Sequence, residues 1–502
     1  MKKRNFDFGT ALLPIIAVLI FGSILVAYPD ETKVMINKWF MFTTTKLGFI
    51  FQVVAIVFVV IMFYLAFSKY GKIKLGEGEP VFGNFSWMAM IFCAVAGAGF
   101  LYWTSIEWAF YYQNPPLHSP LNSAEALENS MAYSLFHWGP SVWVFYIIPA
   151  VAFAYMHYIK KSKRFDVASS VSELLGNKNT KIICRLVNMI FIFAMIGNAV
   201  ITLGVGTPIT TSSIEYLTGI KDTGNLRMIV LCITCLIFTV SALMGLKKGM
   251  SKISNISIFL MLAIVGAVFI FSTNKTFIIK SSINSVGITL HNFFHMSLWT
   301  DPINNTGFVE NWTIFFIAWH VALSMSVSLF IARISKGRTV KNVILGTLTC
   351  GCSAVVLFFG VLTGNSVSLT MSNQVNVSEL LNSIGGPATV IRVYAHTPLG
   401  KALIVIVLIA SVLLTATTFD SVTHTLSMVS MKECPKDAEP PKSYSLFWAV
   451  IISIIPGLLM LFNASLSHIQ SLMVVFSVPV LVLQVLICWS LLRVLKKDFK
   501  VP

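Results

Sequence analysis

The chain has 502 residues, of which 56% are hydrophobic and only 11% charged, with a mean hydropathy of +0.80. This number of polar residues is too small to cover the surface of a water-soluble globule of this size. A lipid bilayer is therefore the expected solvent. The net charge of +16 comes from short Lys and Arg clusters between apolar stretches. Because these clusters form no continuous basic face, no nucleic-acid partner is expected.

Apolar runs long enough to cross ~30 Å of hydrocarbon as α-helices recur along the whole chain. The first run follows Met-Lys-Lys-Arg and lacks a small-residue cleavage site, so we expect it to be retained and not removed as a signal peptide. The sequence predicts an all-α, polytopic membrane protein with twelve spans. These are residues 10–28, 48–68, 85–106, 133–159, 181–204, 226–246, 255–272, 311–333, 342–363, 400–429, 446–464 and 470–492.

The distribution of basic residues predicts the orientation. If the N-terminus is cytoplasmic, the inside segments hold 27 of the 36 Lys and Arg residues. This asymmetry is what the positive-inside rule requires for twelve spans with both termini in the cytoplasm. Two outside connections, residues 272–311 and 364–399, are long and contain helical periodicity. Residues 283–299 fit either an amphipathic helix at the interface or an ordinary packed loop helix.

Residues 94–99 of the predicted third span read Ala-Val-Ala-Gly-Ala-Gly. Helices in lipid are interrupted only where protein or water satisfies the freed backbone groups. The run therefore fits either a discontinuous helix, which exposes carbonyl oxygens to a substrate or cation, or close helix packing on small residues.

Aromatic residues gather at the predicted start of the fourth span, where residues 137–146 read His-Trp-Gly-Pro-Ser-Val-Trp-Val-Phe-Tyr. Trp and Tyr often mark the membrane interface. They also hold quaternary ammonium groups, which donate no hydrogen bond and are bound over aromatic faces. In the eighth span, Trp312 and Trp319 share one helix face. An interfacial belt explains Trp319 less easily, because it lies in the middle of the span beside His320.

Hydroxyl groups are dense in the tenth span, where residues 414–421 read Leu-Thr-Ala-Thr-Thr-Phe-Asp-Ser. Oxygen ligands suit a small hard cation such as sodium. Each hydroxyl can instead bond back to its own helix, and Asp420 fits either an ion ligand or a structural acceptor. The eight cysteines lie mostly in apolar segments, where we expect them to pack as small hydrophobes.

The eighth span from Trp312 to Trp319, with Ile-Ala-Arg-Ile-Ser-Lys-Gly-Arg-Thr at residues 331–339, resembles the signature of the betaine/carnitine/choline transporter family. Phe-His-Trp-Gly-Pro at residues 136–140, Glu107, and Thr-Asp-Pro at residues 300–302 resemble the family as well. The likeness covers nearly the whole chain.

This resemblance implies a LeuT-like fold of two inverted five-helix repeats behind two accessory helices. The whole chain, residues 1–502, would form one transmembrane domain, with accessory helices in residues 10–68 and repeats in residues 85–272 and 311–494. The resemblance also implies a homotrimer in the cell membrane and a substrate site between the repeats. No organic cofactor is expected.

The implied function is secondary active import of a small quaternary-ammonium solute of the betaine, carnitine or choline type. By resemblance, the substrate would lie among aromatic residues, with two non-aromatic residues where other members place further rings. The aromatic positions are Phe110, Trp138, Trp143, Tyr146 and Trp319, and the other two are His320 and Leu323.

Coupling divides the family. Sodium-coupled members resemble this chain in Thr417 and Thr418, with co-ligands near Cys93, Ala96 and Leu414. Sodium-independent exchangers place an arginine where this chain has Ser257. The resemblance therefore favours sodium symport, with a carnitine/γ-butyrobetaine antiporter as the alternative, because the third span lacks the fuller glycine pattern of symporters.

Two other classes of protein fit less well. A membrane-embedded enzyme would need clustered His, Asp or Cys residues within the spans. The histidines here are scattered, so we expect no enzymatic activity. A channel is a further alternative, but one aromatic-lined region in twelve spans favours binding and occlusion over an open pore.

Overall fold

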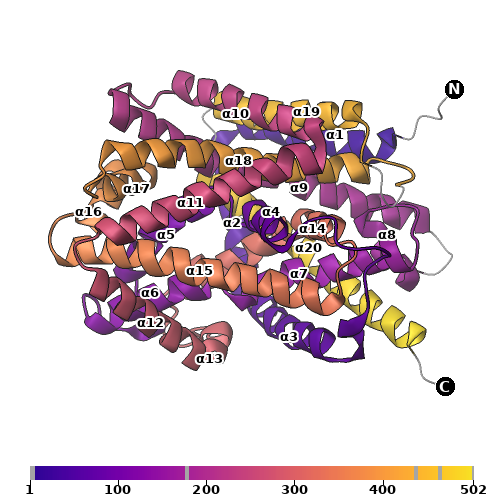
Figure 1. The fold of residues 1–502 in the computed structure, drawn as a ribbon, viewed down its shortest axis with the longest axis horizontal. Coiled ribbons are helices and arrows are strands. Elements are labelled where there is room, and N and C mark those ends of the chain that lie inside the picture. Colours follow the sequence, from indigo (N-terminus) through magenta and orange to yellow (C-terminus); the bar gives the residue numbers. More distant parts are fainter. Residues whose placement is uncertain (1–5, 176–179, 435–438, 462–465, 500–502) are drawn as a thin grey trace.

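The computed structural model describes residues 6–175, 180–434, 439–461 and 466–499, and those residues form helices and connections without a β-strand. Most of the helices run along the long axis of the molecule (Figure 1). They are α1 (Phe8–Ala27), α2 (Pro29–Met41), α3 (Gly48–Phe67), α4 (Asn84–Val95), α5 (Gly99–Gln113), α6 (Ala124–Phe136), α7 (Pro140–Ala154), α8 (Val167–Leu175), α9 (Thr180–Thr218), α10 (Gly224–Gly245), α11 (Ser251–Phe271), α12 (Lys275–His291), α13 (Phe293–Leu298), α14 (Phe315–Ile334), α15 (Val340–Met371), α16 (Val377–Ile384), α17 (Gly386–Ala395), α18 (Lys401–Val429), α19 (Lys442–Leu461) and α20 (Leu466–Asp498).

Short turns of other helix types join or extend these helices. Four are π-helical and two are 3-10 turns: Phe42–Lys46, Tyr155–Ile159, Leu246–Met250 and Val309–Ile314, then Lys69–Lys72 and Pro116–His118. The π-turn at Val309–Ile314 leads directly into α14, so the eighth span is continuous.

In the described part of the chain, eight helices are long and apolar enough to cross a membrane, or ten if each of two bent pairs is one span. The predicted sixth and seventh spans form one helical run, Gly224–Phe271, which changes direction at Gly245, where φ is +80°. The predicted eleventh span extends past the end of α19 into residues outside the described ones. The all-α polytopic class is therefore confirmed, whereas the count of twelve stays a prediction.

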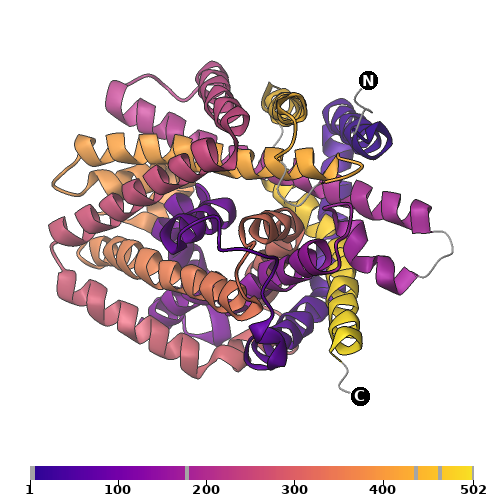
Figure 2. The same cartoon turned by 45° about the vertical axis from the view of Figure 1, so that its right-hand side comes forward.

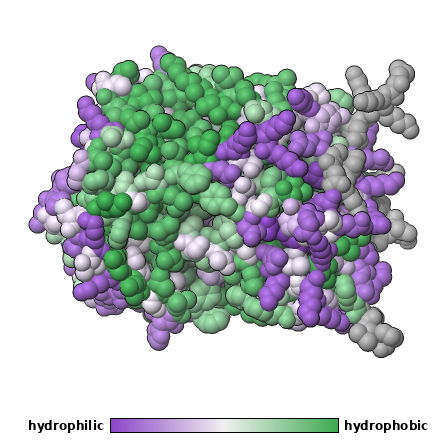
Figure 3. Space-filling model, viewed as in Figure 1, coloured by the Kyte–Doolittle hydropathy of each residue, from purple (hydrophilic) through white to green (hydrophobic). Residues whose placement is uncertain are grey.

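The surface has the polarity of a membrane protein. Apolar residues cover the middle of the molecule and hydrophilic residues gather at its two ends (Figure 3). On α10 the exposed residues Ile229, Ile233, Leu236 and Val240 recur every three or four positions. Such a stripe on the outside of the molecule is solvated by lipid.

The described parts of the segments predicted for the inside meet at one end of the molecule. Contacts between segments connect them: Arg164 with Asp7, Lys160 with Asp498, the Cys434 amide with the Lys163 carbonyl, Lys69 with the Phe499 carbonyl, Lys74 with Thr339 and the Leu246 amide with Glu439. Helix α1 begins at this end, because Asp7 directly precedes it. Helix α2 begins with Pro29 and leaves α1 at an angle of 115°. The compartment that the shared end faces stays a prediction.

Two other connections differ from simple loops. The predicted helix at residues 283–299 is longer and broken, because α12 begins at Lys275 and Asn292 separates it from α13. In the second long connection, α15 continues to Met371 and α16 and α17 follow. The helical periodicity expected in both connections is therefore confirmed.

The interior is built by pairs of long helices. The most extensive packing is between α7 and α14 and between α9 and α18, and α10 lies along α19. Turning the molecule by 45° keeps α4 and α14 in its interior, surrounded by other helices (Figure 2). In the two predicted repeats, α9 and α18 hold the same position, and so do α10 and α19. Each of these two pairs packs together. The division into repeats stays a prediction.

Candidate functional site

The third span is broken at its run of small residues. The helix ends at Val95 as α4 and resumes at Gly99 as α5, with a bend of 58° between the two parts. Gly97 has φ of +47°, a conformation that favours glycine. A Cβ atom there would also lie 2.7 Å from the hydroxyl of Thr418 on α18. The discontinuous helix, one of two interpretations of the sequence, is therefore present.

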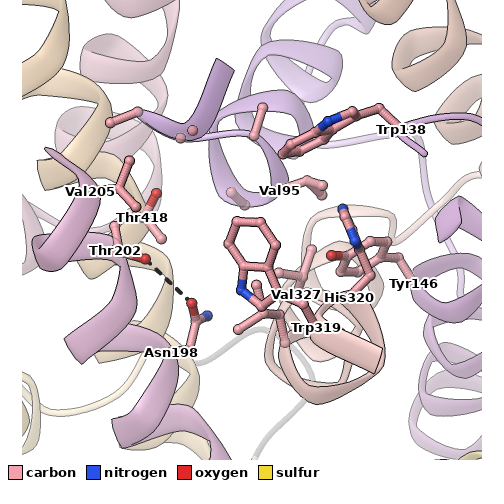
Figure 4. Close-up of a pocket in the computed structure, with 16 residues that line it drawn as sticks. Val95, Trp138, Tyr146, Asn198, Thr202, Val205, Trp319, His320, Val327 and Thr418 are labelled. Atoms are coloured by element: carbon pink, nitrogen blue, oxygen red, sulfur yellow. Dashed lines mark hydrogen bonds between the residues drawn. The ribbon is translucent and has the colours of Figure 1, made fainter. Parts of the chain in front are cut away.

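The broken segment forms one wall of a cavity inside the helix bundle (Figure 4). Helices α7, α9, α14 and α18 supply the other walls. Five residues predicted for the substrate site line this cavity: Trp138, Tyr146, Trp319, His320 and Leu323. Trp138 and Trp319, which are 181 positions apart in sequence, thus share one enclosed space with the backbone of residues 94–99.

Two indoles face this space at a steep angle. The ring centroids of Trp138 and Trp319 lie 6.2 Å apart, with 77° between their planes. Trp319 is 7% exposed, and its indole nitrogen has no hydrogen-bond partner among the described residues. Rings at this separation and angle are in edge-to-face contact, so a cation–π site here would lie beside the pair and not between the two rings.

Trp138 is oriented by a buried polar network. Its indole N–H donates to Oε2 of Glu107 at 2.8 Å, and the Tyr111 hydroxyl donates to Oε1 at 2.7 Å. Because Tyr111 has a single proton, Nδ1 of His137 donates to the Tyr111 oxygen at 2.7 Å. The second nitrogen of His137 accepts from Thr313 on the eighth span at 3.0 Å. These bonds join three predicted spans behind the cavity wall.

The two remaining predicted aromatic residues lie elsewhere among the described residues. Phe110 packs against Trp312 with ring centroids 5.4 Å apart and lies 6.3 Å from the ring of Trp103. Trp143 is fully buried against Gly351 of α15, and its indole N–H donates to the Trp138 carbonyl at 3.0 Å. Neither ring lines the cavity, so Trp143 contacts the site through the backbone of Trp138.

The predicted sodium ligands come together at the break. The Thr418 hydroxyl lies 3.3 Å from the Cys93 carbonyl and 3.2 Å from the Leu414 carbonyl, to which Thr417 donates at 2.8 Å. The Ala96 carbonyl accepts the Gly99 amide at 3.0 Å. The oxygens present are neutral, and the described residues contain no cluster of three His, Cys, Asp or Glu that would hold a metal ion. This donor set fits a monovalent hard cation better than a transition metal.

Asp420 and Ser257 are two polar residues whose roles the sequence did not settle, and neither lines the cavity. Asp420 is buried and accepts a hydrogen bond from Ser241 on α10, which favours the structural interpretation. Ser257 is buried on α11, and its hydroxyl donates to the Ile253 carbonyl of its own helix. No guanidinium occupies that position.

The fifth span contributes cavity residues that were not predicted from the sequence. Asn198, Thr202 and Val205 of α9 line the cavity, and the Thr202 hydroxyl donates to the Asn198 side-chain oxygen at 3.3 Å. Asn198 and Thr202 are one helical turn apart in a strongly apolar span. A membrane span needs no polar residue for solubility. Two of them one turn apart were therefore the signal that this face lines a cavity.

An apolar belt, buried spans and a central cavity beside a broken helix define a multi-pass helical membrane transporter. The model of the betaine/carnitine/choline family transporters, BCCT, matches residues 10–500, and the chain belongs to this family.

Curated relatives agree with this assignment. A carnitine transporter of Acinetobacter baumannii is 32% identical over 508 aligned residues, which cover 100% of this chain and 92% of the relative. The uncharacterized transporter YeaV of Escherichia coli K12 is 32% identical over 445 aligned residues, which cover 88% of this chain and 91% of the relative.

Among solved structures, a Na⁺-coupled sialic acid symporter in a substrate-bound outward-open state matches with a TM-score of 0.49 at 12% identity, covering 88% of this chain and 85% of that one.

Proposed function

We propose that this transporter imports a quaternary-ammonium solute of the betaine, carnitine or choline type in symport with sodium. The observation that carries the proposal is the shared cavity, in which Trp138 and Trp319 face the broken third span. A cation–π contact is worth ~2 kcal/mol or more where water is excluded. A quaternary nitrogen needs such faces because it has no hydrogen to donate. The name of the Acinetobacter relative supports carnitine as a test solute.

Sodium coupling is supported by the oxygens at the break. Thr418 joins the bend of the third span to the tenth span through the Cys93 carbonyl. A sodium ion held by these oxygens would favour the bent backbone that forms the cavity wall. By linkage, the solute must then tighten sodium binding by the same factor by which sodium tightens solute binding.

Exchange without sodium is the alternative function. The observation in its favour is that the sodium ligands already bond to one another, since Thr417 and Thr418 both reach the Leu414 carbonyl. The observation against it is Ser257, which provides no positive charge to replace the ion.

Uptake into proteoliposomes separates the two functions. The purified transporter is reconstituted, and accumulation of labelled glycine betaine, carnitine and choline is measured with and without an inward sodium gradient. Symport predicts accumulation of at least one solute only with the gradient. Equal uptake without sodium, stimulated by preloading with a related betaine, would establish exchange.

The double substitution Thr417→Ala with Thr418→Ala tests the ion site. We expect the sodium concentration for half-maximal uptake to rise at least tenfold, because two hydroxyl oxygens are removed from the donor set. Thr425→Ala on the same helix is the matched control, since its hydroxyl donates to Ser421 within α18. Unchanged sodium dependence in the double variant contradicts this site.

Three features of the assembly belong to the same proposal. The protein acts in the cell membrane as a homotrimer, with both termini in the cytoplasm. The support for this orientation is the excess of Lys and Arg in the segments that meet at one end. The support for the trimer is family resemblance alone.

A further inference from the structure

His320 brings a hydrogen-bond acceptor to a cavity wall that is otherwise aromatic and aliphatic, formed by Trp138, Tyr146, Trp319, Leu323 and Val327. Its Nδ1 atom lies 2.7 Å from the Phe316 carbonyl, one turn earlier on α14. A backbone carbonyl can only accept, so Nδ1 carries the proton. In the neutral ring the lone pair is then on Nε2. Among the described residues, none donates a hydrogen bond to that atom.

The ring lies among the indoles proposed to hold the cation. Its centroid is 5.1 Å from Trp138, with an angle of 87° between the planes, and 5.8 Å from Trp319. The ring centroid of Tyr146 is 6.0 Å away. Asn198 lies on the far side of Trp319 (Figure 4). The acceptor therefore adjoins the position of the cationic head.

A second proton on His320 is incompatible with this position. It would place a positive charge beside the cation that the indoles attract, in a space that excludes most water. The neutral ring is the form that suits a bound cation. It offers a lone pair, and a fully methylated nitrogen has no hydrogen to give it.

We infer that His320 selects a methylated ammonium head that keeps one N–H, so that the site ranks dimethylammonium solutes at or above their trimethyl counterparts. This inference rests on the proposed function and extends its substrate class from quaternary to tertiary methylated ammonium solutes. The N–H donates to Nε2 of His320 while the methyl groups lie against Trp138 and Trp319. A trimethyl head fills the same space but leaves Nε2 without a donor, which lowers affinity.

The test compares two solutes that differ by one methyl group. Binding of N,N-dimethylglycine and glycine betaine to the purified full-length transporter is measured by calorimetry with sodium present, at a pH at which the dimethyl amine is protonated. We expect dimethylglycine to bind wild type at least as tightly as glycine betaine. In His320→Phe, which keeps a ring without an acceptor, the affinity ratio should move roughly tenfold toward glycine betaine.

Two further variants make the ratio decisive. His320→Gln keeps a side-chain oxygen acceptor, and it should retain a preference closer to wild type than His320→Phe does. His424→Phe is the matched control, because His424 is also a buried histidine of a spanning helix but lies outside this cavity. An unchanged ratio in His320→Phe overturns the inference, whether or not affinity falls overall.

A second pair of solutes identifies the donor. Carnitine carries a hydroxyl that γ-butyrobetaine lacks, and both are trimethylated. If His320→Phe changes the carnitine to γ-butyrobetaine ratio and leaves the methyl ratio unchanged, the donor is a hydroxyl and the inference is wrong. If wild type binds none of the four solutes, the proposed function itself fails; a solute bound without the predicted ranking overturns only the role of His320.

Discussion

At the scale of single residues, the site depends on side chains held by groups that do not touch the cavity. Glu107 is completely buried, and both of its carboxylate oxygens accept hydrogen bonds. Burying a carboxylate is costly unless hydrogen bonds compensate. Here the hydrogen bonds from Trp138 and Tyr111 compensate the cost of burying Glu107. The bond from Trp138 also fixes the orientation of its indole in the cavity wall.

Substituting Trp319 tests the cage directly. Trp319→Ala removes one aromatic face, and we expect a loss of ~1–2 kcal/mol, roughly a tenfold or larger fall in solute affinity. Trp319→Phe should lose less, because a weaker face remains. Trp489, which is 58% exposed on α20, gives the control variant Trp489→Ala. Equal affinity of Trp319→Ala and wild type in a binding assay would remove Trp319 from the site.

Glu107→Gln tests the positioning of Trp138. Trp138 and Tyr111 donate to different carboxylate oxygens of Glu107, and glutamine replaces one of these acceptors with an NH2 donor. We expect affinity to fall ~3–10-fold, with a stability loss of about 1–3 kcal/mol from the unpaired buried donor. In a double-mutant cycle with Trp138→Phe, the two losses should not add. Additive losses would mean that Glu107 acts on the fold and not on the indole.

At the scale of elements, the break between α4 and α5 connects the cavity to the oxygens on α18. One wall of the cavity, formed by residues 94–99, directly follows Cys93, whose carbonyl Thr418 approaches. In the proposed symport, a change in either part would reach the other through a few backbone bonds. This proximity is the structural basis for coupling in the proposed symport.

Gly97→Ala tests the break. The residue has φ of +47°, and the added Cβ would lie 2.7 Å from the Thr418 hydroxyl. We expect transport to fall at least tenfold, with a marked loss of sodium activation, while the protein still folds. Gly78→Ala is the matched control, because it also has positive φ, +84°, but nothing lies within 4 Å of its Cβ position. Sodium-stimulated uptake by Gly97→Ala at the wild-type rate would show that the close approach has no functional role.

At the scale of the whole molecule, ion pairs hold distant segments together at one end. Asp7 precedes α1 and pairs with Arg164 at 3.1 Å, and Lys160 pairs with Asp498 at 3.0 Å. The connection between α7 and α8 therefore holds both the first and the last described helices. The chain closes on itself at this end through contacts between residues more than 150 positions apart.

The pH dependence of stability tests this closure. Burial raises the pKa of Asp7, but hydrogen bonds from Thr10 and Arg164 outweigh it and hold the pKa below 3.8. A lowered pKa in the folded state means that the stabilisation is present above pH ~4 and is lost as pH falls through the folded pKa.

Asp7→Asn should therefore lower the melting temperature at pH 7 by an amount equivalent to about 1 kcal/mol. That difference from wild type should shrink as the pH falls below ~4. Thermal unfolding of the detergent-solubilised protein gives the measurement, with Asp30→Asn at the start of α2 as an exposed control. A difference that is independent of pH would exclude the charge of Asp7 as its cause.

The sequence by itself determined the features that depend on solvent and local chemistry. Hydropathy determined the helical membrane class, because every backbone group in lipid must bond within its own helix. Lys and Arg clusters identified which segments share a side, and the small-residue run marked where the third span breaks. Motif resemblance pointed to the family and to Trp138 and Trp319.

Only the tertiary structure decided which side chains share one space. Trp143 looks as suitable for a cation as Trp138 in sequence, yet the tight packing of α15 at Gly351 encloses it. Asn198 and Thr202 gave only a weak signal, because they face the cavity through the packing of α9 against α18. The acceptor on His320 likewise follows from a ring orientation fixed by Phe316. Such relations join residues far apart in the chain, and local pattern does not encode the direction in which one helix faces another.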